Sequence, residues 1–189
     1  MNRLLAAALE VQAFCRAQNW RFCFIGVLAV QRWGEPRLTQ DAGLTVITGF
    51  GDEAPFVDTF LAHFEGRLPD ARAFALRNRV LLLLRSSGGV PLDVALGAMP
   101  FEERAVARAS DFMIAPGVVI LTCGAEDLVV LKAFAGRPRD WLDIEGIAIR
   151  HTGRLDERLI WAELVPLLEL KESPEDARQL HAILDRARP

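Results

Sequence analysis

The sequence predicts an α+β protein, with a small mixed β-sheet, helices packed on it, and a C-terminal helical segment. Two observations predict this class. Over residues 1–123, short apolar segments of strand character alternate with helical patterns, which is typical of a sheet covered by helices. Residues 124–189 hold only helical patterns, and the chain has no internal repeat or long linker. We therefore expect a core at 1–123 and a helical segment at 124–189 packed on that core.

The first elements alternate between helix and strand. Apolar residues at helical spacing predict an amphipathic helix over 3–17. The segment 21–26 reads as a short apolar strand that ends at a glycine, and 27–34 reads as a short helix closed by a glycine. The next strand is expected over 38–49, because this segment is rich in Thr, Val and Ile.

The middle of the chain repeats this alternation. A helix is expected over 54–69, where large apolar residues gather on one side. Residues 79–97 predict a hairpin whose two strands flank the turn sequence SSGG. A helix over 100–110 carries acids in its first turn, which suits the helix dipole, and 117–122 is another short strand. The sheet should therefore contain four or five strands.

Four helices close the chain. They are expected over 124–136, 137–151, 156–170 and 173–187. The last has the clearest start, because a serine cap is followed by a proline and two acids.

Composition narrows the class of protein. Of the 189 residues 51% are apolar, which is enough to fill one core. The net charge of −3 and the pI of about 5.7 disfavour a generally basic surface that coats nucleic acid. The three cysteines are widely spaced and form no CxxC, so they match neither a zinc site nor a disulfide framework. The apolar N-terminus is interrupted by Glu10, unlike a signal peptide, and no apolar stretch is long enough to span a membrane, so we expect a cytoplasmic protein.

Three segments together carry candidate chemistry. They are a glycine, a short helix and GEPRLTQD at 26–41, the acid of PLDV at 91–94, and the basic and acidic residues of KAFAGRPRDWLD at 132–143. Two carboxylates on neighbouring strands can bind Mg²⁺, which prefers oxygen ligands. A glycine where a strand meets a helix lets backbone N–H groups approach phosphate, and a lysine can neutralise triphosphate charge. These parts suit phosphoryl-type transfer.

With these segments the sequence resembles the nucleotidyltransferase toxins of the AbiEii type, within the DNA polymerase beta-like superfamily. Their pattern has a Gly-Gly or Gly-Ser pair, a short helix and Gly-x-x-Arg-x-Thr-x-Asp-x-Asp. A later strand Asp follows, and then a Lys with a downstream Arg-x-Lys-Asp-x-x-Asp. The resemblance runs from about Phe22 to Ile149. The matching residues are Gly26, Gly34, Arg37, Thr39, Asp41, Asp93, Lys132, Arg137, Asp140 and Asp143.

The resemblance implies a nucleotidyltransferase core that moves a nucleotide from a nucleoside triphosphate to an RNA acceptor, for example tRNA-like, or to a protein acceptor. It implies a toxin–antitoxin or phage-defence role and a cognate antitoxin. The lack of an apolar stretch long enough to span a membrane separately predicts no membrane partner. By the same resemblance, Asp41 and Asp93 bind Mg²⁺ or Mn²⁺. The implied nucleotide-binding residues are Gly26, Val27, Arg37, Thr39, Lys132 and Arg137. The implied catalytic residues are Asp41, Asp93, Lys132, Asp140 and Asp143, the last two orienting the lysine or assisting proton transfer.

Three positions depart from the family pattern. Val27 replaces the second small residue of the glycine pair, Gly43 replaces the second acid, and Arg139 replaces a lysine. Residues i and i+2 of a strand share a face, so an acid at 43 would have joined Asp41 at the metal. The alternative function is therefore a degenerate protein that binds nucleotide or a protein partner without turnover. A third interpretation is that the ancestor of this protein was active and that Val27 and Gly43 reduced the activity of this copy.

Other interpretations of the same residues stay open. Asp41 can be a strand-end acid bonded to backbone, and Asp93 can point to solvent from a half-exposed strand. Lys132 can lie on a solvated helix face. The arginines from Arg137 to Arg158 can bind a polynucleotide or pair with nearby acids, and the second outcome is the more common.

Overall fold

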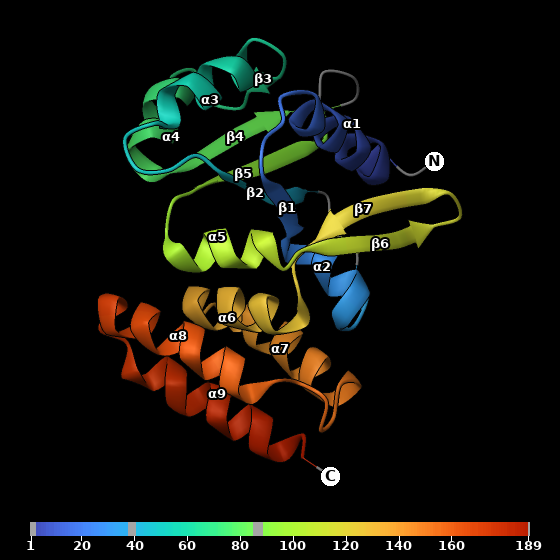
Figure 1. Ribbon diagram of the computed structural model, residues 1–189, viewed down its shortest axis with the longest axis vertical. Helices are drawn as coiled ribbons and strands as arrows, with labels where there is room; N and C mark the ends of the chain where they lie inside the picture. The colour runs from blue at the N-terminus through green and yellow to red at the C-terminus, as the bar shows by residue number, and fades with distance from the viewer. Residues whose placement is uncertain (1–2, 38–40, 85–88, 189) are drawn as a thin grey trace. The chain divides into compact units, whose positions relative to one another are not determined.

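The computed structural model describes residues 3–37, 41–84 and 89–188 (Figure 1). The chain divides into two compact units. Unit 1 comprises Met1–Leu28 and Leu38–Cys123, and unit 2 comprises Ala29–Arg37 and Gly124–Pro189. The domain division expected at residues 123 and 124 stays a prediction, because compactness does not by itself show independent folding.

Sixteen helices and strands are assigned in the described residues. The helices are α1 (Arg3–Ala17), α2 (Gly26–Trp33), α3 (Glu53–Leu61), α4 (Ala71–Asn78), α5 (Pro100–Ala107), α6 (Ala125–Ala135), α7 (Pro138–Arg150), α8 (Glu157–Lys171) and α9 (Pro174–Arg186). The strands are β1 (Phe22–Ile25), β2 (Ala42–Ile47), β3 (Glu65–Gly66), β4 (Val80–Leu84), β5 (Pro91–Gly97), β6 (Ser110–Ala115) and β7 (Val118–Thr122).

The strands of unit 1 form one mixed sheet. Within the described residues its order is β3-β4-β5-β2-β1-β7-β6. β2 and β5 run parallel, as do β1 and β7, and the other neighbouring strands are antiparallel. β1 and β2 are antiparallel neighbours, so β1 ends where β2 begins. The start of α2, immediately after β1, therefore lies at the same end of the sheet as the start of β2.

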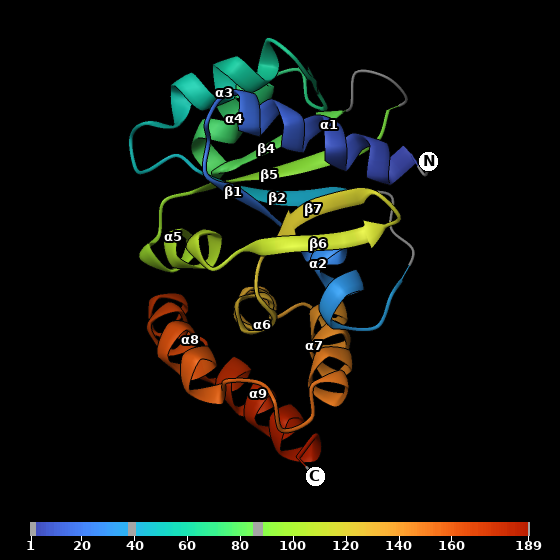
Figure 2. The same cartoon turned by 45° about the vertical axis from the view of Figure 1, so that its right-hand side comes forward.

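One face of this sheet carries the core of unit 1. Helices α1, α3 and α4 lie on that face, whereas α5 lies on the other (Figures 1 and 2). Alternate strand residues are buried beneath these helices, including Leu44 on β2, Leu81 and Leu83 on β4, and Leu92 and Val94 on β5. Because side chains alternate between faces, the residues between them point to the opposite, partly exposed face.

Unit 2 is helical. Helices α6, α7, α8 and α9 pack on one another around buried residues such as Leu128, Ile144, Leu164 and Leu180. The four helices predicted for the end of the chain are confirmed to within a residue or two at each boundary.

The helix predicted over 54–69 is wrong in its second half. Helix α3 ends at Leu61, and the chain then forms β3 and α4, neither of which was predicted. Gly66 lies in β3, and a Cβ atom there would come within 2.6 Å of the Ala71 Cβ. The chain therefore passes closely against the start of α4, and only glycine fits this approach.

The helix predicted over 100–110 is also too long. Helix α5 ends at Ala107, and β6 follows as an edge strand that was not predicted. In β6, Phe112 and Ile114 pack against the core and Met113 between them is exposed. This alternation covers only three residues, too few to predict a strand, and pairing with β7 specifies it. The described residues thus form seven strands where four or five were expected.

Three predictions fall wholly or partly outside the described residues. They are Thr39, the first three residues of the strand predicted over 38–49, and most of the SSGG turn, at residues 86–88. The hairpin itself is confirmed, because β4 and β5 pair antiparallel on either side of that turn.

Candidate functional site

Asp41 and Asp93 lie at one end of the sheet of unit 1. Asp41 directly precedes β2, and Asp93 is the third residue of its parallel neighbour β5. Asp93 lies directly opposite Gly43, so Asp41 is the diagonal neighbour of Asp93 across the two strands. The two predicted metal ligands therefore come from adjacent strands at the amino end of the β2–β5 pair.

The charge state of Asp93 reflects this neighbourhood. Burial is the largest influence and raises the pKa of its carboxyl group. The positive charge and hydrogen bond of Arg67 act to lower this pKa, whereas the negative charge of Asp41 raises it, and the net shift is upward. The Asp93 side chain is 42% exposed. The two acids thus interact electrostatically, and Asp93 remains accessible to solvent.

A row of paired residues crosses the partly exposed face of the sheet. Leu82 on β4 lies opposite Asp93, Asp93 lies opposite Gly43, and Gly43 lies opposite Ile25 on β1. All four are intermediate in exposure, while their neighbours along each strand are mostly buried. Residues directly opposite one another point to the same face. The acid pair therefore belongs to the face opposite α1, α3 and α4.

Gly43 leaves an open position in this row. A Cβ atom added there would meet only the Ile25 Cγ1 atom within 4 Å, at 3.7 Å, which is ordinary van der Waals contact. Gly43 is not among the glycines with positive φ. The strand would therefore accept a side chain at position 43, and an aspartate there would lie directly beside Asp93.

The start of α2 lies at the same end of the sheet. Gly26 has a φ of 60°, a left-handed conformation that favours glycine, and no atom lies within 4 Å of a Cβ placed there. The first backbone N–H groups of a helix have no partner within the helix. The adjacent Val27 side chain is only 8% exposed, so protein covers most of it.

Arg67 is a site residue that was not predicted. Its Nη2 group donates to Asp93 Oδ1 in an ion pair, and its backbone N–H donates to Leu82 O at 3.0 Å. Its Nε–H is buried and has no hydrogen-bond partner among the described residues. No sequence motif indicated this residue. Its place beside Asp93 depends on the pairing of β3 with β4, and β3 was not predicted.

Unit 2 holds the other predicted site residues in a chain of ion pairs. Lys132 Nζ donates to Asp140 Oδ1 at 3.0 Å and to Asp143 Oδ2 at 2.5 Å. Arg37 binds Asp143 through two hydrogen bonds of 2.9 and 3.1 Å, and Arg137 Nε donates to Asp140 at 2.6 Å. Lys132 is 5% exposed, so the interpretation as a lysine on a solvated helix face is wrong.

This network favours the ionised form of Asp143. Burial raises the pKa of the Asp143 carboxyl group, but hydrogen bonds from Arg37 and Lys132, with their charges, more than offset that effect and the pKa is lowered. Each carboxylate accepts from two cationic side chains, so both acids are well paired within unit 2. In this arrangement Asp143 holds Arg37 to α7, and Asp140 and Asp143 together fix the Lys132 ammonium group.

Gly34, another matching residue, has a packing role in unit 2. A Cβ atom there would lie 3.0 Å from Ile147 Cγ1 and 3.5 Å from Asp143 O. Its carbonyl oxygen accepts a hydrogen bond of 2.8 Å from Arg150 Nη1. Close approach to α7 therefore accounts for a glycine at this position.

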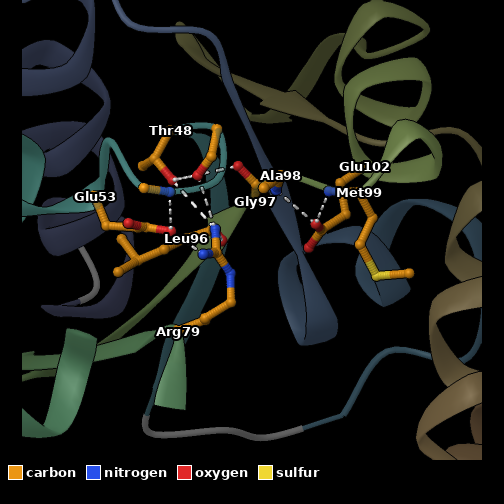
Figure 3. A network of polar contacts seen from close by, with 10 residues as sticks. Thr48, Glu53, Arg79, Leu96, Gly97, Ala98, Met99 and Glu102 are labelled. Carbon is orange, nitrogen blue, oxygen red and sulfur yellow. Dashed lines mark hydrogen bonds and ion pairs between the residues drawn. The ribbon is translucent and has the colours of Figure 1, made fainter. Parts of the chain in front are cut away.

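A second arginine, Arg79, forms an ion pair at the carboxyl end of the same two strands, β2 and β5 (Figure 3). Arg79 forms an ion pair with Glu53, and its Nη2 group donates to Gly49 O at 3.1 Å and to Leu96 O at 2.6 Å. The Phe50 ring lies 4.8 Å from its guanidinium carbon. Arg79 thus joins the ends of β2 and β5 to the start of α3.

Neither a larger metal-ligand cluster nor a membrane-spanning helix is found in the described part of the chain. Residues 3–37, 41–84 and 89–188 contain no group of three or more His, Cys, Asp or Glu side chains arranged to hold a metal. Over the same residues, no helix is long and apolar enough to cross a membrane.

Comparison with known proteins identifies the fold. No protein-family model and no curated protein sequence matches this chain. Among solved structures, an antigenic nucleotidyltransferase-like protein from Paracoccidioides brasiliensis aligns with a TM-score of 0.53 and 16% identity, over 94% of this chain and 92% of that one. The antibiotic-resistance factor ANT(2'')-Ia aligns with a TM-score of 0.48 and 15% identity, over 94% and 96%. From the first of these likenesses, the mixed sheet and its helices have the fold of a nucleotidyltransferase-like protein.

Proposed function

We propose that this chain binds a nucleoside triphosphate with a divalent cation and transfers a nucleotide to an RNA or protein acceptor. The observation that carries the proposal is the placement of Asp41 and Asp93 on adjacent parallel strands, at the end of the sheet where α2 begins. In a nucleotidyltransferase-like fold, such an acid pair is suited to a metal-bound triphosphate. The finer assignment, an AbiEii-type toxin with a cognate antitoxin, rests on the sequence resemblance.

The donor set fits one divalent cation better than two. Asp41 and Asp93 supply carboxylate oxygens, and Mg²⁺ or Mn²⁺ can complete its coordination with water and phosphate oxygens. At position 43 the strand offers no third carboxylate, although it has room for one. When bound, the ion would neutralise charge that develops as pyrophosphate departs.

The other proposed roles, cation binding and phosphate binding, belong to different residues of the chain. Asp41 and Asp93 would hold the cation, and the backbone N–H groups after Gly26 would donate to phosphate oxygens. Gly26 has no side chain, and no atom lies within 4 Å of the position that its Cβ would take, so the start of this helix is open. Contacts of Lys132, Arg37 and Arg137 with the triphosphate stay predictions, because these residues belong to unit 2.

A second candidate function is nucleotide binding without turnover. Two observations favour it, namely the open position at Gly43 and the ion pair that already engages Asp93. Loss of a carboxylate from a two-metal site removes transition-state stabilisation, and several kcal/mol correspond to roughly 10²–10⁴ in rate. Such a protein would keep the fold and the triphosphate site while losing most of the transfer activity.

Isothermal titration of nucleoside triphosphates, with and without Mg²⁺, tests the proposal. The proteins are wild type, Gly43→Asp, Asp93→Asn and the control Asp58→Asn, which alters an exposed Arg72–Asp58 ion pair elsewhere in unit 1. We expect metal-dependent binding by wild type, loss of binding in Asp93→Asn, no change in the control, and roughly tenfold tighter binding by Gly43→Asp.

The outcomes separate the candidate functions. If wild type binds, transfer of labelled nucleotide distinguishes a transferase from a non-catalytic binder. If only Gly43→Asp binds, the chain is an attenuated nucleotidyltransferase and Gly43 is the cause. If neither wild type nor Gly43→Asp binds nucleoside triphosphate, the likeness describes a fold alone and the proposed function is wrong.

A further inference from the structure

Arg67 places a positive charge where the proposed function needs a metal ion. Its guanidinium group is paired with Asp93, one of the two acids that would bind the cation. The three side chains Arg67, Asp41 and Asp93 carry a net charge of about −1 at neutral pH, half that of the acid pair alone. A divalent cation and this guanidinium group therefore compete for the same carboxylate.

The backbone holds Arg67 in this position. Its N–H donates to Leu82 O at 3.0 Å, and Leu82 lies opposite Asp93. Arg67 thus lies in line with the row formed by Leu82, Asp93 and Gly43 on the partly exposed face. The pairing therefore follows from strand register.

The pair is open to exchange. The Arg67 side chain is 26% exposed and that of Asp93 is 42% exposed, so water and ions can reach both. The buried Nε–H of Arg67 has no hydrogen-bond partner in the described residues, so its guanidinium group does not use its full donor set. A phosphate group could accept two parallel hydrogen bonds from a guanidinium group that had left Asp93.

We propose that Arg67 is the resident counter-ion of Asp93, that it leaves this carboxylate when a divalent cation binds, and that it then pairs with the triphosphate. This inference rests on the function proposed above. It adds the sequence of events in which the cation displaces Arg67 from Asp93 and Arg67 then pairs with the triphosphate. Metal alone binds weakly because it must displace a guanidinium group. Metal and nucleotide together bind well because Arg67 gains a phosphate partner in exchange for Asp93. The site thereby favours the metal–nucleotide complex over either component.

Titration of free Mn²⁺, followed by its electron paramagnetic resonance signal, tests the first step without any enzyme activity. The variants are Arg67→Met, which removes the charge and keeps the apolar stem, and Arg67→Lys, which keeps the charge. Arg72→Met is the matched control, since Arg72 also pairs with an aspartate in unit 1 but lies outside the site. We expect Arg67→Met to bind Mn²⁺ about five- to tenfold more tightly than wild type. Arg67→Lys and Arg72→Met should stay near wild type.

Titration of a non-hydrolysable ATP analogue at saturating Mn²⁺ tests the second step. Arg67→Met should bind the analogue about tenfold more weakly, because the freed guanidinium partner is missing. The substitution therefore changes metal affinity and nucleotide affinity in opposite directions. A residue that merely supports the fold would weaken both, so this opposite response is specific to the exchange. If Arg67→Met does not fold, Arg67→Gln, which is neutral but retains a donor, replaces it. This variant should also bind Mn²⁺ more tightly and the nucleotide analogue more weakly than wild type.

The results also separate this inference from the proposed function. Suppose that Arg67→Met binds Mn²⁺ no more tightly than wild type while Gly43→Asp binds it more tightly. The metal site then stands and the exchange role of Arg67 is wrong. If no variant, Gly43→Asp included, binds Mn²⁺ in a manner that depends on Asp93, both the metal site and the exchange are wrong.

Discussion

The two arginines at opposite ends of the β2–β5 pair differ in how completely they are bound. Arg79, at the carboxyl ends, pairs with Glu53 and donates to two backbone carbonyl oxygens (Figure 3), and its guanidinium group lies over the Phe50 ring. Arg67, towards the amino ends, pairs with Asp93 and keeps a buried Nε–H without a partner among the described residues. The same pair of strands thus carries one closed ion cluster and one open one.

This difference separates a structural role from a functional one. A closed cluster stabilises the fold, because each donor has a fixed acceptor and removal of one partner leaves the others unsatisfied. An open pair contributes little to stability, since its charges remain partly solvated, yet its side chains are available to a ligand. The following predictions test the distinction, from the largest expected effect to the smallest.

Removal of charge from the buried ion-pair network of unit 2 should have the largest effect on stability. Asp143→Asn leaves Lys132 and Arg37 without the carboxylate they share, and that side chain is 5% exposed. Breaking a buried pair in this way should lower the free energy of unfolding of the protein by about 3–5 kcal/mol, measured by urea unfolding at pH 7. A loss below about 1 kcal/mol would show that closed networks are no more stabilising than open pairs.

The effect of Asp143→Asn should also depend on pH. The pKa of Asp143 is lowered in the folded protein relative to its unfolded value of about 3.9, so its stabilisation is present above about pH 4. That stabilisation disappears as the pH falls through the folded-state pKa. The gap between wild type and variant should therefore be constant near neutral pH and narrow below about pH 4.

The two arginines themselves give the next comparison. Arg79→Met should lower the free energy of unfolding of the protein by about 2–4 kcal/mol, because it removes the cation paired with Glu53 and the donor to two carbonyl oxygens. Arg67→Met should change it by less than about 1 kcal/mol. Both substitutions keep an unbranched side chain, so thermal unfolding of the two variants compares the lost charges directly. Equal losses would contradict the distinction between the clusters.

Asp93→Asn should have the smallest effect on stability and the opposite sign. The pKa of Asp93 is raised in the folded protein, so above that pKa the ionised carboxylate is less favourable there than in the unfolded chain. Since the side chain is 42% exposed, solvent screening limits the gain from removing its charge. We expect an increase on the order of a few tenths of a kcal/mol at pH 7. A clear loss of stability would mean that the Arg67–Asp93 pair supports the fold.

Local patterns predicted the elements that bury their own apolar residues. β2, β5 and the terminal helices carry periodic apolar residues, and each was predicted within a few residues of its place. β3 has only two residues and β6 alternates only over Phe112, Met113 and Ile114, so neither shows a period long enough to predict a strand, and pairing with β4 and β7 defines them. The missed strand β3 also explains the missed residue Arg67, because only that pairing brings it to Asp93.

The candidate site was predicted to a similar extent. Asp41 and Asp93 were placed on neighbouring strands, and the register now shows Gly43 between Ile25 and Asp93. The sequence allowed Lys132 to be either solvated or functional, whereas the structure buries it between two acids. Burial of a charged side chain depends on partners 8 and 11 residues further along the chain, on another helix, and helix periodicity alone does not reveal it.

The open position at Gly43 has a genetic consequence. Every glycine codon becomes an aspartate or glutamate codon through a change of its second base. Because the strand has room for a side chain there, we expect such a variant to fold, and it would place a new acid beside Asp93. If the proposed transfer activity harms its host, cells carrying this gene would continually produce harmful variants and selection would remove them. Deep sequencing of codon 43, with and without expression, would reveal that selection as a depletion of acidic codons.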